Sequence, residues 1–398
     1  MASRSIVYTA AAALLASQAM AVNNGLAVTP QMGWDNWNAL GCDVSEDLLV
    51  ETANLIVDYG LKDLGYHYVV LDDCWSTGRN ASNNNSLVAD AAKFPRGMAA
   101  VADDLHALGF GFGMYSSAGK YTCGRYAGSL GYEEVDAQTW ADWGVDYLKY
   151  DNCYNEGQAG NQQISESRYE KMANALNATG RPILYSLCNW GEDYPWNWGS
   201  TIANSWRISG DVFDYWDTEG ADAWNCGLPG FHCSITNIMN KASFIVSKAE
   251  PGGWNDLDML EVGNGAMTDT EYVSHFSIFV DSGPAGQAPQ IQMSWEVRDL
   301  WANRMSNETA AAIISASSAT GNATTGYNAT RVGGDTRYNA TATSYKQGLA
   351  EKNELLLGNV TTTVQPSGTI SASIEPHGVA MYRLRYAGGG ALRKRDEL

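Results

Sequence analysis

Short apolar segments alternate with longer segments of helical periodicity between residue 29 and about residue 280. The segments typical of strands are MGWDNW, YHYVVLDDCW, FGFGMYSS, VDYLKYDNC, PILYSLCNW, SWRISGD and GWNDLDML. Between them lie segments such as SEDLLVETANLIVDYGLKDLG, which opens with a Ser-Glu-Asp helix cap, and FPRGMAAVADDLHALGFG, which closes on glycine. This alternation predicts an α/β fold in which helices cover parallel strands.

The number of strands separates two α/β architectures. Seven strand segments are visible and an eighth is predicted around HFSIFVD, which favours a (β/α)₈ TIM barrel over an open doubly wound sheet. No GxGxxG or P-loop motif follows any of these strands. After about residue 305 the chain changes to Thr, Ser, Asn and Gly with short alternating segments, which predicts an antiparallel β-sandwich domain.

The two ends of the chain carry targeting signals. Residues 1–21 combine one basic residue, an apolar stretch and the small-x-small pattern Ala19-Met20-Ala21, which predicts a removed signal peptide and secretion. The catalytic barrel is then expected over residues 22–304, the β-domain over 305–387 and a flexible tail over 388–398. That tail ends in RDEL, which is either an endoplasmic reticulum retention signal or a solvated charged end.

Composition and charge exclude several classes of protein. The chain has 398 residues, 45% of them hydrophobic and 17% charged, which excludes a disordered or fibrous protein. Its net charge of -19 comes without any long run of Lys or Arg, so we expect no nucleic-acid partner. No segment after the signal peptide has the roughly 20 apolar residues that a membrane span needs. Oligomeric state is left open.

Sequons and cysteines agree with an oxidising compartment. Asn-x-Ser/Thr acceptor sites occur at Asn80, Asn84, Asn177, Asn307, Asn322, Asn328, Asn339 and Asn359. Seven cysteines occur, none with the paired CxxC spacing of a zinc site. An odd number leaves one thiol without a partner.

Acidic and aromatic residues gather at the predicted strand ends, the edge where barrel enzymes place their active sites. They are Trp37, Asp72, Asp73, Trp75, Tyr115, Lys149, Asp151, Trp190, Arg207, Asp211, Asp256 and Asp258. Any one of them could be a helix cap or a loop acid. Their repetition on successive strands is the stronger indication of a site.

Two carboxylates in this set have a cation nearby. Lys149 and Asp151 point to the same face by strand alternation, and the cation is expected to lower the pKa of Asp151 and keep it nucleophilic. Arg207 and Asp211 supply a second carboxylate with a bidentate donor. Two such carboxylates in a mouth lined by Trp and Tyr are what glycoside cleavage requires.

Two other classes fit part of this pattern. A magnesium-dependent barrel enzyme would also place carboxylates on successive strand ends, although the lysine beside Asp151 and the many tryptophans weigh against it. A sugar-binding protein without catalysis would need the aromatics and the hydroxyl-binding acids, but not two further carboxylates placed to face each other.

Seven motifs, in order, resemble glycoside hydrolase family 27, and most closely its secreted fungal and yeast α-galactosidases. They are TPQMGWDNWN, LDDCW, GMYSSAGKYTCGRYAGS, WGVDYLKYDNC, SLCNWGEDYPWNW, NSWRISGD and PGGWNDLDMLEVGN. Members of this family join a (β/α)₈ barrel to a C-terminal antiparallel β-domain. One segment, HFSIFVDSGPAGQAPQIQMSWEV, departs from the family pattern, where an apolar eighth strand ends in Ser-Pro-Leu.

The resemblance implies a role for each matching residue. Asp151 would be the nucleophile and Asp211 the general acid/base of a retaining double displacement, without metal or cofactor. The implied disulfides pair Cys42 with Cys74, Cys123 with Cys153 and Cys226 with Cys233, leaving Cys188 free. The residues implied to bind or shape the sugar site are Trp37, Asp72, Asp73, Tyr115, Cys123, Lys149, Asn189, Trp190 and Arg207.

The resemblance also implies a substrate class. Family members that accept N-acetylgalactosamine place small residues after the position of Cys188, whereas this chain has the bulkier Asn189, Trp190 and Glu192. We therefore expect terminal α-linked galactose as the substrate, in an oligosaccharide or a galactomannan. N-acetylgalactosaminidase or β-L-arabinopyranosidase activity and non-catalytic galactose binding are the alternatives. Asp211 is expected to have a raised pKa through burial and the nearby charge of Asp151.

Overall fold

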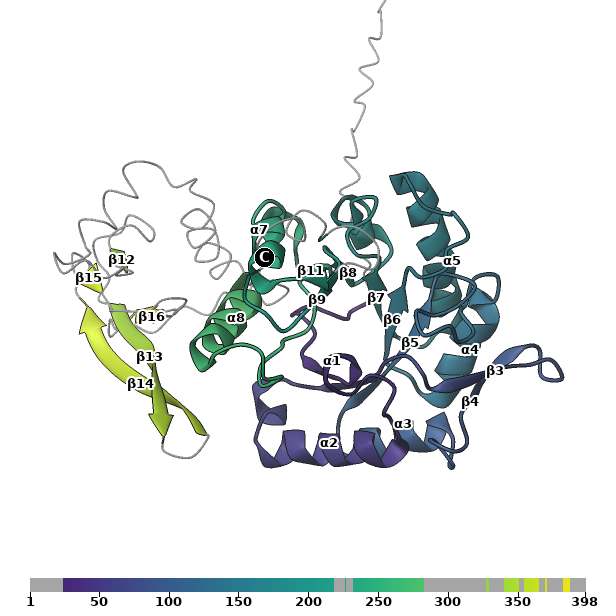
Figure 1. The fold of residues 1–398 in the computed structure, drawn as a ribbon, viewed down its shortest axis with the longest axis horizontal. Coiled ribbons are helices and arrows are strands. Elements are labelled where there is room, and N and C mark those ends of the chain that lie inside the picture. Colours follow the sequence, from purple (N-terminus) through teal and green to yellow (C-terminus); the bar gives the residue numbers. More distant parts are fainter. Residues whose placement is uncertain are drawn as a thin grey trace, which may run out of the picture.

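A computed structural model describes residues 24–217, 226 and 232–282 and five strands after residue 326. Seven parallel strands form a curled sheet in the order β1-β2-β5-β6-β7-β8-β11 (Figure 1). Their bounds are β1 Gly33–Asp35, β2 Tyr68–Leu71, β5 Gly111–Ser117, β6 Tyr147–Asp151, β7 Leu184–Cys188, β8 Ser205–Arg207 and β11 Trp254–Asp256. The order follows the chain order, as the sequence predicts for the wall of a barrel.

Helices connect these strands, and most of them cover the outer face of the sheet, whereas the short α1 lies at the carboxyl end of β1 (Figure 1). They are α1 Trp37–Leu40, α2 Glu46–Asp58, α3 Met98–Ala107, α4 Glu133–Trp143, α5 Gln162–Thr179, α7 Ile235–Ala242 and α8 Asp269–Ser282. The predicted cap of α2 is confirmed, since the Ser45 hydroxyl accepts a hydrogen bond from Leu48 N at 3.2 Å. Short 3₁₀ turns at Lys62–Leu64, Pro195–Asn197, Gly199–Thr201 and Val246–Lys248 complete the connections.

The two faces of strand β6 show how alternation builds the site. Leu148 and Tyr150 are fully buried in the main core between the sheet and the helices. Tyr147 points the other way and packs with Val70 and Leu184 in a second, smaller cluster that residues 26–27 cover. Lys149 and Asp151 share the face of Tyr147, so this cluster forms the apolar floor beneath them.

The predicted eighth strand is wrong for the segment it was placed on, because HFSIFVD lies within helix α8. Thr268 and Glu271 form a capping box at its start: Thr268 N donates to the Glu271 carboxylate at 2.8 Å, and Glu271 N donates to the Thr268 hydroxyl at 3.3 Å. This local signal fixes a helix where apolar content alone suggested a strand.

Two insertions extend the basic pattern on the described part of the chain. Strands β3 Ser76–Asn80 and β4 Ser86–Ala89 form an antiparallel hairpin after β2. Strands β9 Asp211–Val212 and β10 His232–Cys233 form a short parallel pair after β8. The sequon residues Asn80, Asn84 and Asn177 are exposed, as glycosylation requires.

Strands near the C-terminus are antiparallel. Strand β13 Ala340–Ala350 pairs with β14 Glu354–Val364 and with β16 Tyr382–Tyr386. Strand β12 Tyr327–Asn328 pairs with β15 Thr369–Ile370. The predicted signal peptide, the RDEL tail and the sequons at Asn307, Asn322 and Asn339 lie outside the described residues.

Three disulfides join Cys42 to Cys74, Cys123 to Cys153 and Cys226 to Cys233, which are the pairings that the resemblance implies. Cys188 is a free, buried thiol. The first two bridges tie loops to residues at the carboxyl ends of β2 and β6, so they brace the edge where the predicted site residues lie. No helix in the described part of the chain is long and apolar enough to cross a membrane.

Candidate active site

Parallel pairing brings the predicted residues to one edge of the sheet. Asp151, the last residue of β6, is in register with Ser117 of β5 and Cys188 of β7. Arg207, the last residue of β8, is in register with Asp256 of β11. All seven strands end on this side, which therefore collects side chains from segments that are far apart in the sequence.

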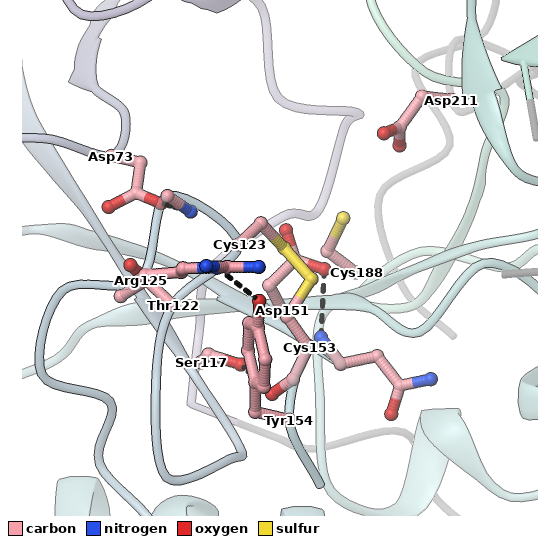
Figure 2. Close-up of a disulfide and its surroundings, with 12 residues drawn as sticks. Asp73, Ser117, Thr122, Cys123, Arg125, Asp151, Cys153, Tyr154, Cys188 and Asp211 are labelled. Atoms are coloured by element: carbon pink, nitrogen blue, oxygen red, sulfur yellow. Dashed lines mark hydrogen bonds between the residues drawn. A yellow bond between two sulfur atoms is a disulfide. The ribbon is translucent and has the colours of Figure 1, made fainter. Parts of the chain in front are cut away.

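Asp151 is held rigidly in the wall of the site. It is buried; Tyr115 Oη donates to its Oδ2 at 2.9 Å, and Asn152 N donates to its Oδ1 at 2.8 Å. The disulfide between Cys123 and Cys153 lies beside it (Figure 2). These two sulfurs and the carboxylate lie within 4.8 Å of one another, but sulfurs joined in a disulfide are not free as metal ligands.

The expected effect of Lys149 on Asp151 is outweighed by other interactions. Burial first, and then the negative charge of Asp211, raise the pKa of Asp151 to about 7, although Lys149 acts in the opposite direction. Lys149 donates instead to Asp72 Oδ2 at 2.6 Å. The prediction that Lys149 keeps the pKa of Asp151 low is therefore wrong.

Asp35 is a member of this cluster that the sequence analysis missed. It ends strand β1, and its Oδ1 accepts a hydrogen bond from Trp37 N at 2.9 Å. Burial and the charge of Asp72 raise the pKa of Asp35 to about 8. Its position at a strand end, like that of Asp72, was the available signal. Lys149 thus faces two carboxylates whose charges repel one another.

Asp73 binds the turn that carries the disulfide. Its Oδ2 accepts from Gly124 N at 2.7 Å and its Oδ1 accepts from Cys74 N at 2.7 Å. Burial raises the pKa of Asp73, and these two hydrogen bonds oppose the shift. The turn around Cys123 is therefore fixed both covalently, through Cys153, and by the carboxylate of Asp73.

Arg207 connects two carboxylates on the opposite side of the mouth. Its Nη2 lies 2.9 Å from Asp211 Oδ1 and 2.6 Å from Asp258 Oδ2. The side chain of Asp258 is 4% exposed, whereas that of Asp211 is 46% exposed. Arg207 is thus anchored on its buried side by Asp258 and meets Asp211 at the solvent side.

The pKa of Asp211 shifts in the direction opposite to the prediction. Burial raises it, but the charges of Arg207 and Lys149 outweigh burial and hold the pKa of Asp211 below its ordinary value. Asp258 differs, because burial raises its pKa to about 6 in spite of Arg207. The proton that the two carboxylates Asp151 and Asp211 share resides mainly on Asp151 in the free protein.

The end of β7 completes the site. Cys188 lies beside Asp151 (Figure 2), and Arg207 Nη1 donates to its sulfur at 3.4 Å. Asn189 is buried and donates through Nδ2 to the backbone carbonyl of Glu192 at 2.8 Å. Trp190 is buried and has a φ of 56°, a conformation that the surrounding loop must hold in place.

Arg168 is a second residue that the sequence analysis missed. This fully buried arginine of α5 donates to the backbone carbonyls of Ala118 and Gln158 and to the side chain of Asn152. Asn152 in turn donates to Glu192 at 2.6 Å. Arg168 therefore ties together three loops behind Asp151. An arginine within a helix carries no sequence signal for such a role.

This arrangement defines a class of protein. A parallel α/β sheet bears two carboxylates at or just beyond the carboxyl ends of its strands, one buried and one half-exposed, and the charge of the half-exposed one raises the pKa of the buried one. That is the arrangement of a glycoside hydrolase built on an α/β barrel.

Comparisons with known proteins identify the family. The family profile described as alpha galactosidase A matches residues 29–315. A relative from Lachancea cidri, named α-galactosidase, is 43% identical, covering 91% of this chain and 95% of the relative. The chain belongs to the α-galactosidase A family.

Solved structures agree with that assignment. An α-galactosidase from Saccharomyces cerevisiae, solved with raffinose, is 38% identical with a TM-score of 0.73, covering 92% of this chain and 99% of that chain. α-Galactosidase I from Mortierella vinacea is 40% identical with a TM-score of 0.71, covering 91% and 98%.

The alignment with the Lachancea cidri relative also reveals a difference in length. It extends over 461 positions, whereas this chain has 398 residues in all. At least 63 positions of the alignment therefore have no residue of this chain. The atypical segment HFSIFVDSGPAGQAPQIQMSWEV begins within α8, and its part after residue 282 lies outside the described residues.

Proposed function

We propose that this protein is a retaining α-galactosidase that releases terminal α-linked D-galactose from oligosaccharides or galactomannans. The observation that carries the proposal is that two carboxylates from the ends of different strands face one site (Figure 2), where the negative charge of Asp211 raises the pKa of Asp151. The related α-galactosidase from Saccharomyces cerevisiae that was solved with raffinose supports the proposal.

The two carboxylates divide the chemistry between them. Asp151 attacks the anomeric carbon and forms a covalent galactosyl-enzyme, while Asp211 gives its proton to the leaving oxygen. Water then attacks the same carbon from the side of the departed group, and Asp211 takes up its proton. The first step requires the shared proton to sit on Asp211 and Asp151 to be ionised.

Binding of the sugar prepares this arrangement of charge. A galactose hydroxyl that takes up one of the guanidinium hydrogen bonds of Arg207 would weaken its hold on Asp211, and the pKa of Asp211 would rise. Trp37 and Tyr115 shape the pocket, and the remaining proposed sugar-binding residues are Asp72, Asp73, Cys123, Lys149, Asn189, Trp190 and Arg207.

The end of β7 favours galactose over its 2-acetamido analogue. Asn189 and Trp190 are both buried, and Asn189 is fixed in position by its hydrogen bond to the backbone carbonyl of Glu192. A rigid, filled wall excludes a bulky substituent more strongly than a flexible one. β-L-Arabinopyranosides lack only the exocyclic hydroxymethyl group of galactose, and we propose them as side substrates.

Domain organisation and location extend the proposal. The seven-stranded sheet is proposed as most of a (β/α)₈ barrel over residues 22–304, followed by an antiparallel β-sandwich domain over 305–387 and a flexible tail over 388–398. The three disulfides fit a protein of the secretory pathway. Residues 1–21 are proposed as a signal peptide that directs the protein to secretion. If RDEL is read as a retention signal, it would instead return the protein to the endoplasmic reticulum.

Hydrolysis followed by NMR tests the function. The expected result is release of galactose from p-nitrophenyl α-galactoside, with the α-anomer appearing first and the β-anomer only after mutarotation. The corresponding α-N-acetylgalactosaminide and β-L-arabinopyranoside serve as comparison substrates. Initial release of the β-anomer would contradict the double displacement, and galactose binding without hydrolysis would favour the sugar-binding alternative. Loss of activity in EDTA would favour the metal-dependent class.

A further inference from the structure

Strands β9 and β10 place a solvent-facing surface beside Asp211. Asp211 is in register with His232 in this parallel pair, so the two side chains share a face. Val212 points to the opposite face and is buried. Phe213 lies two residues beyond Asp211 and therefore returns to the exposed face.

Phe213 and His232 form a flat, exposed pair of rings. Their centroids are 4.6 Å apart and their planes are inclined by 26°, which is a stacked arrangement. Phe213 is 48% exposed and His232 is also exposed. The ring of Tyr215 lies 5.5 Å from that of Phe213 and extends the aromatic surface.

The backbone holds this surface in place. Phe213 N donates to Cys233 O at 3.0 Å. Val212 N donates to Asp258 Oδ2 at 2.7 Å. The disulfide between Cys226 and Cys233 anchors β10 directly after His232. An exposed aromatic pair that is fixed in this way costs little conformational entropy when it binds a ligand.

The reaction geometry indicates what meets this surface. Asp211 donates its proton to the glycosidic oxygen, so the leaving group must lie on the side of Asp211 and away from Asp151. Phe213 and His232 are the next side chains on that exposed face. A pyranose ring has an apolar C–H face that packs on aromatic rings and hydroxyls that hydrogen-bond at their edges.

We propose that Phe213 and His232 form a binding platform for the leaving sugar, the hexopyranose to which the cleaved galactose is attached. This inference rests on the proposed function, because it requires Asp211 to be the proton donor. It adds a determinant of preference among galactosides, one that selects oligosaccharides over compounds with a small leaving group.

Two substrates separate the platform from the galactose pocket. Melibiose has glucose as its leaving group, whereas α-galactosyl fluoride has a single atom that cannot reach the platform. We expect Phe213→Ala to lower the ratio of kcat/KM for melibiose to that for the fluoride by about three- to tenfold. Phe213→Tyr keeps a ring and should restore most of the ratio. Phe213 is preferred to His232 as the first target, because the charge of His232 also acts on Asp211.

Phe244→Ala is the matched control. Phe244 is another exposed phenylalanine, 58% exposed, which follows the last turn of α7 and so lies towards the end of the sheet away from the mouth. Its substitution should leave the ratio at the wild-type value. Circular dichroism of each variant checks that the fold is retained.

The outcomes distinguish the two proposals. A ratio that stays unchanged in Phe213→Ala, or an equal fall for both substrates, would overturn the platform while leaving the proposed function intact. A wild-type protein that cleaves neither substrate would overturn the proposed function and with it the platform. A selective fall for melibiose, restored by Phe213→Tyr, would support the platform.

Discussion

The two sides of the mouth hold their carboxylates in different ways. On the β5–β6 side, Asp151 is buried and fixed by Tyr115 and by the backbone of Asn152. On the β8–β9 side, Asp211 is 46% exposed and meets Arg207 at its outer edge. A nucleophile benefits from a fixed position, whereas a group that first gives and later takes a proton needs access to water. The difference in environment therefore matches the proposed division of roles.

The same comparison governs where the shared proton lies. Burial raises the pKa of Asp151 to about 7, while cations hold the pKa of Asp211 below its ordinary value. In the free protein the proton is thus on the side opposite to the one that catalysis needs. Substrate binding therefore has to move the proton from Asp151 to Asp211 before the first step.

The largest expected effect comes from removing the proposed nucleophile. Asp151→Asn keeps the size of the side chain but cannot form the galactosyl-enzyme, so kcat should fall by about 10⁴-fold for every galactoside. Steady-state rates with p-nitrophenyl α-galactoside measure it. Galactose binding, followed by calorimetry, should persist and serves as the check on folding. Rates within tenfold of the wild type would remove Asp151 from its proposed role.

Asp211→Asn should be selective for the leaving group. It removes proton donation, which is worth about 10²–10⁴-fold for a sugar leaving group. Fluoride departs without a proton, so the rate with α-galactosyl fluoride should fall much less for the first step. The measurement is kcat/KM for melibiose and for the fluoride in parallel. Equal losses on both substrates would mean that Asp211 acts as something other than a proton donor.

The sequence predicts those features that depend on short local patterns, such as the alternation of side chains along a strand or the residues at a helix start. The parallel order of the strands, the shared face of Lys149 and Asp151, and the cap at Ser45 all follow from local patterns. The helix at 269–282 was missed because its apolar residues suit a strand equally well, and only the capping box at Thr268 decides the matter.

The partners of the charged groups could not be predicted in the same way. Lys149 is two residues from Asp151 in the chain, yet its hydrogen bond goes to Asp72, which is 77 residues away. The direction of the pKa of Asp211 depends on Arg207 and Lys149 together. The pKa of each carboxyl combines the effect of burial with the effects of several charges. These effects depend on distances that only the folded chain determines.

Asp258→Asn sharpens the comparison on the Arg207 side. With one proton shared by Asp151 and Asp211, kcat/KM should fall at high pH as that proton is lost, with an apparent pKa of about 7. Removing the charge of Asp258 leaves Arg207 to act more strongly on Asp211. The basic limb, which is set by the proton on Asp151, should stay near pH 7, while kcat/KM should fall about tenfold because the form with its proton on Asp211 becomes rarer.

The matched control is Asp256→Asn, which changes the other acid of the same segment. Among the contacts of the described residues, Arg207 pairs with Asp258 and makes no direct hydrogen bond to Asp256. Its effect on kcat/KM should be smaller than that of Asp258→Asn. The pH profile of kcat/KM for each variant is the measurement. An unchanged kcat/KM in Asp258→Asn would show that the charge of Asp258 does not influence the protonation of Asp211.

The smallest expected effect is on stability, and it follows from the raised pKa of Asp151. The folded protein holds a proton on this carboxyl up to about pH 7, whereas the unfolded chain loses it near pH 3.8. Unfolding therefore releases a proton between these two values, so the contribution of Asp151 to stability decreases as pH rises from about 4 to 7. Asparagine cannot ionise and avoids this loss. Relative to wild type, Asp151→Asn should gain about 2–6 °C in Tm between pH 4 and pH 7.5. The exposed Asp103→Asn on α3 is the control for the general effect of removing one carboxylate. A Tm difference for Asp151→Asn that does not vary with pH would mean that this carboxyl is ionised without cost in the folded protein.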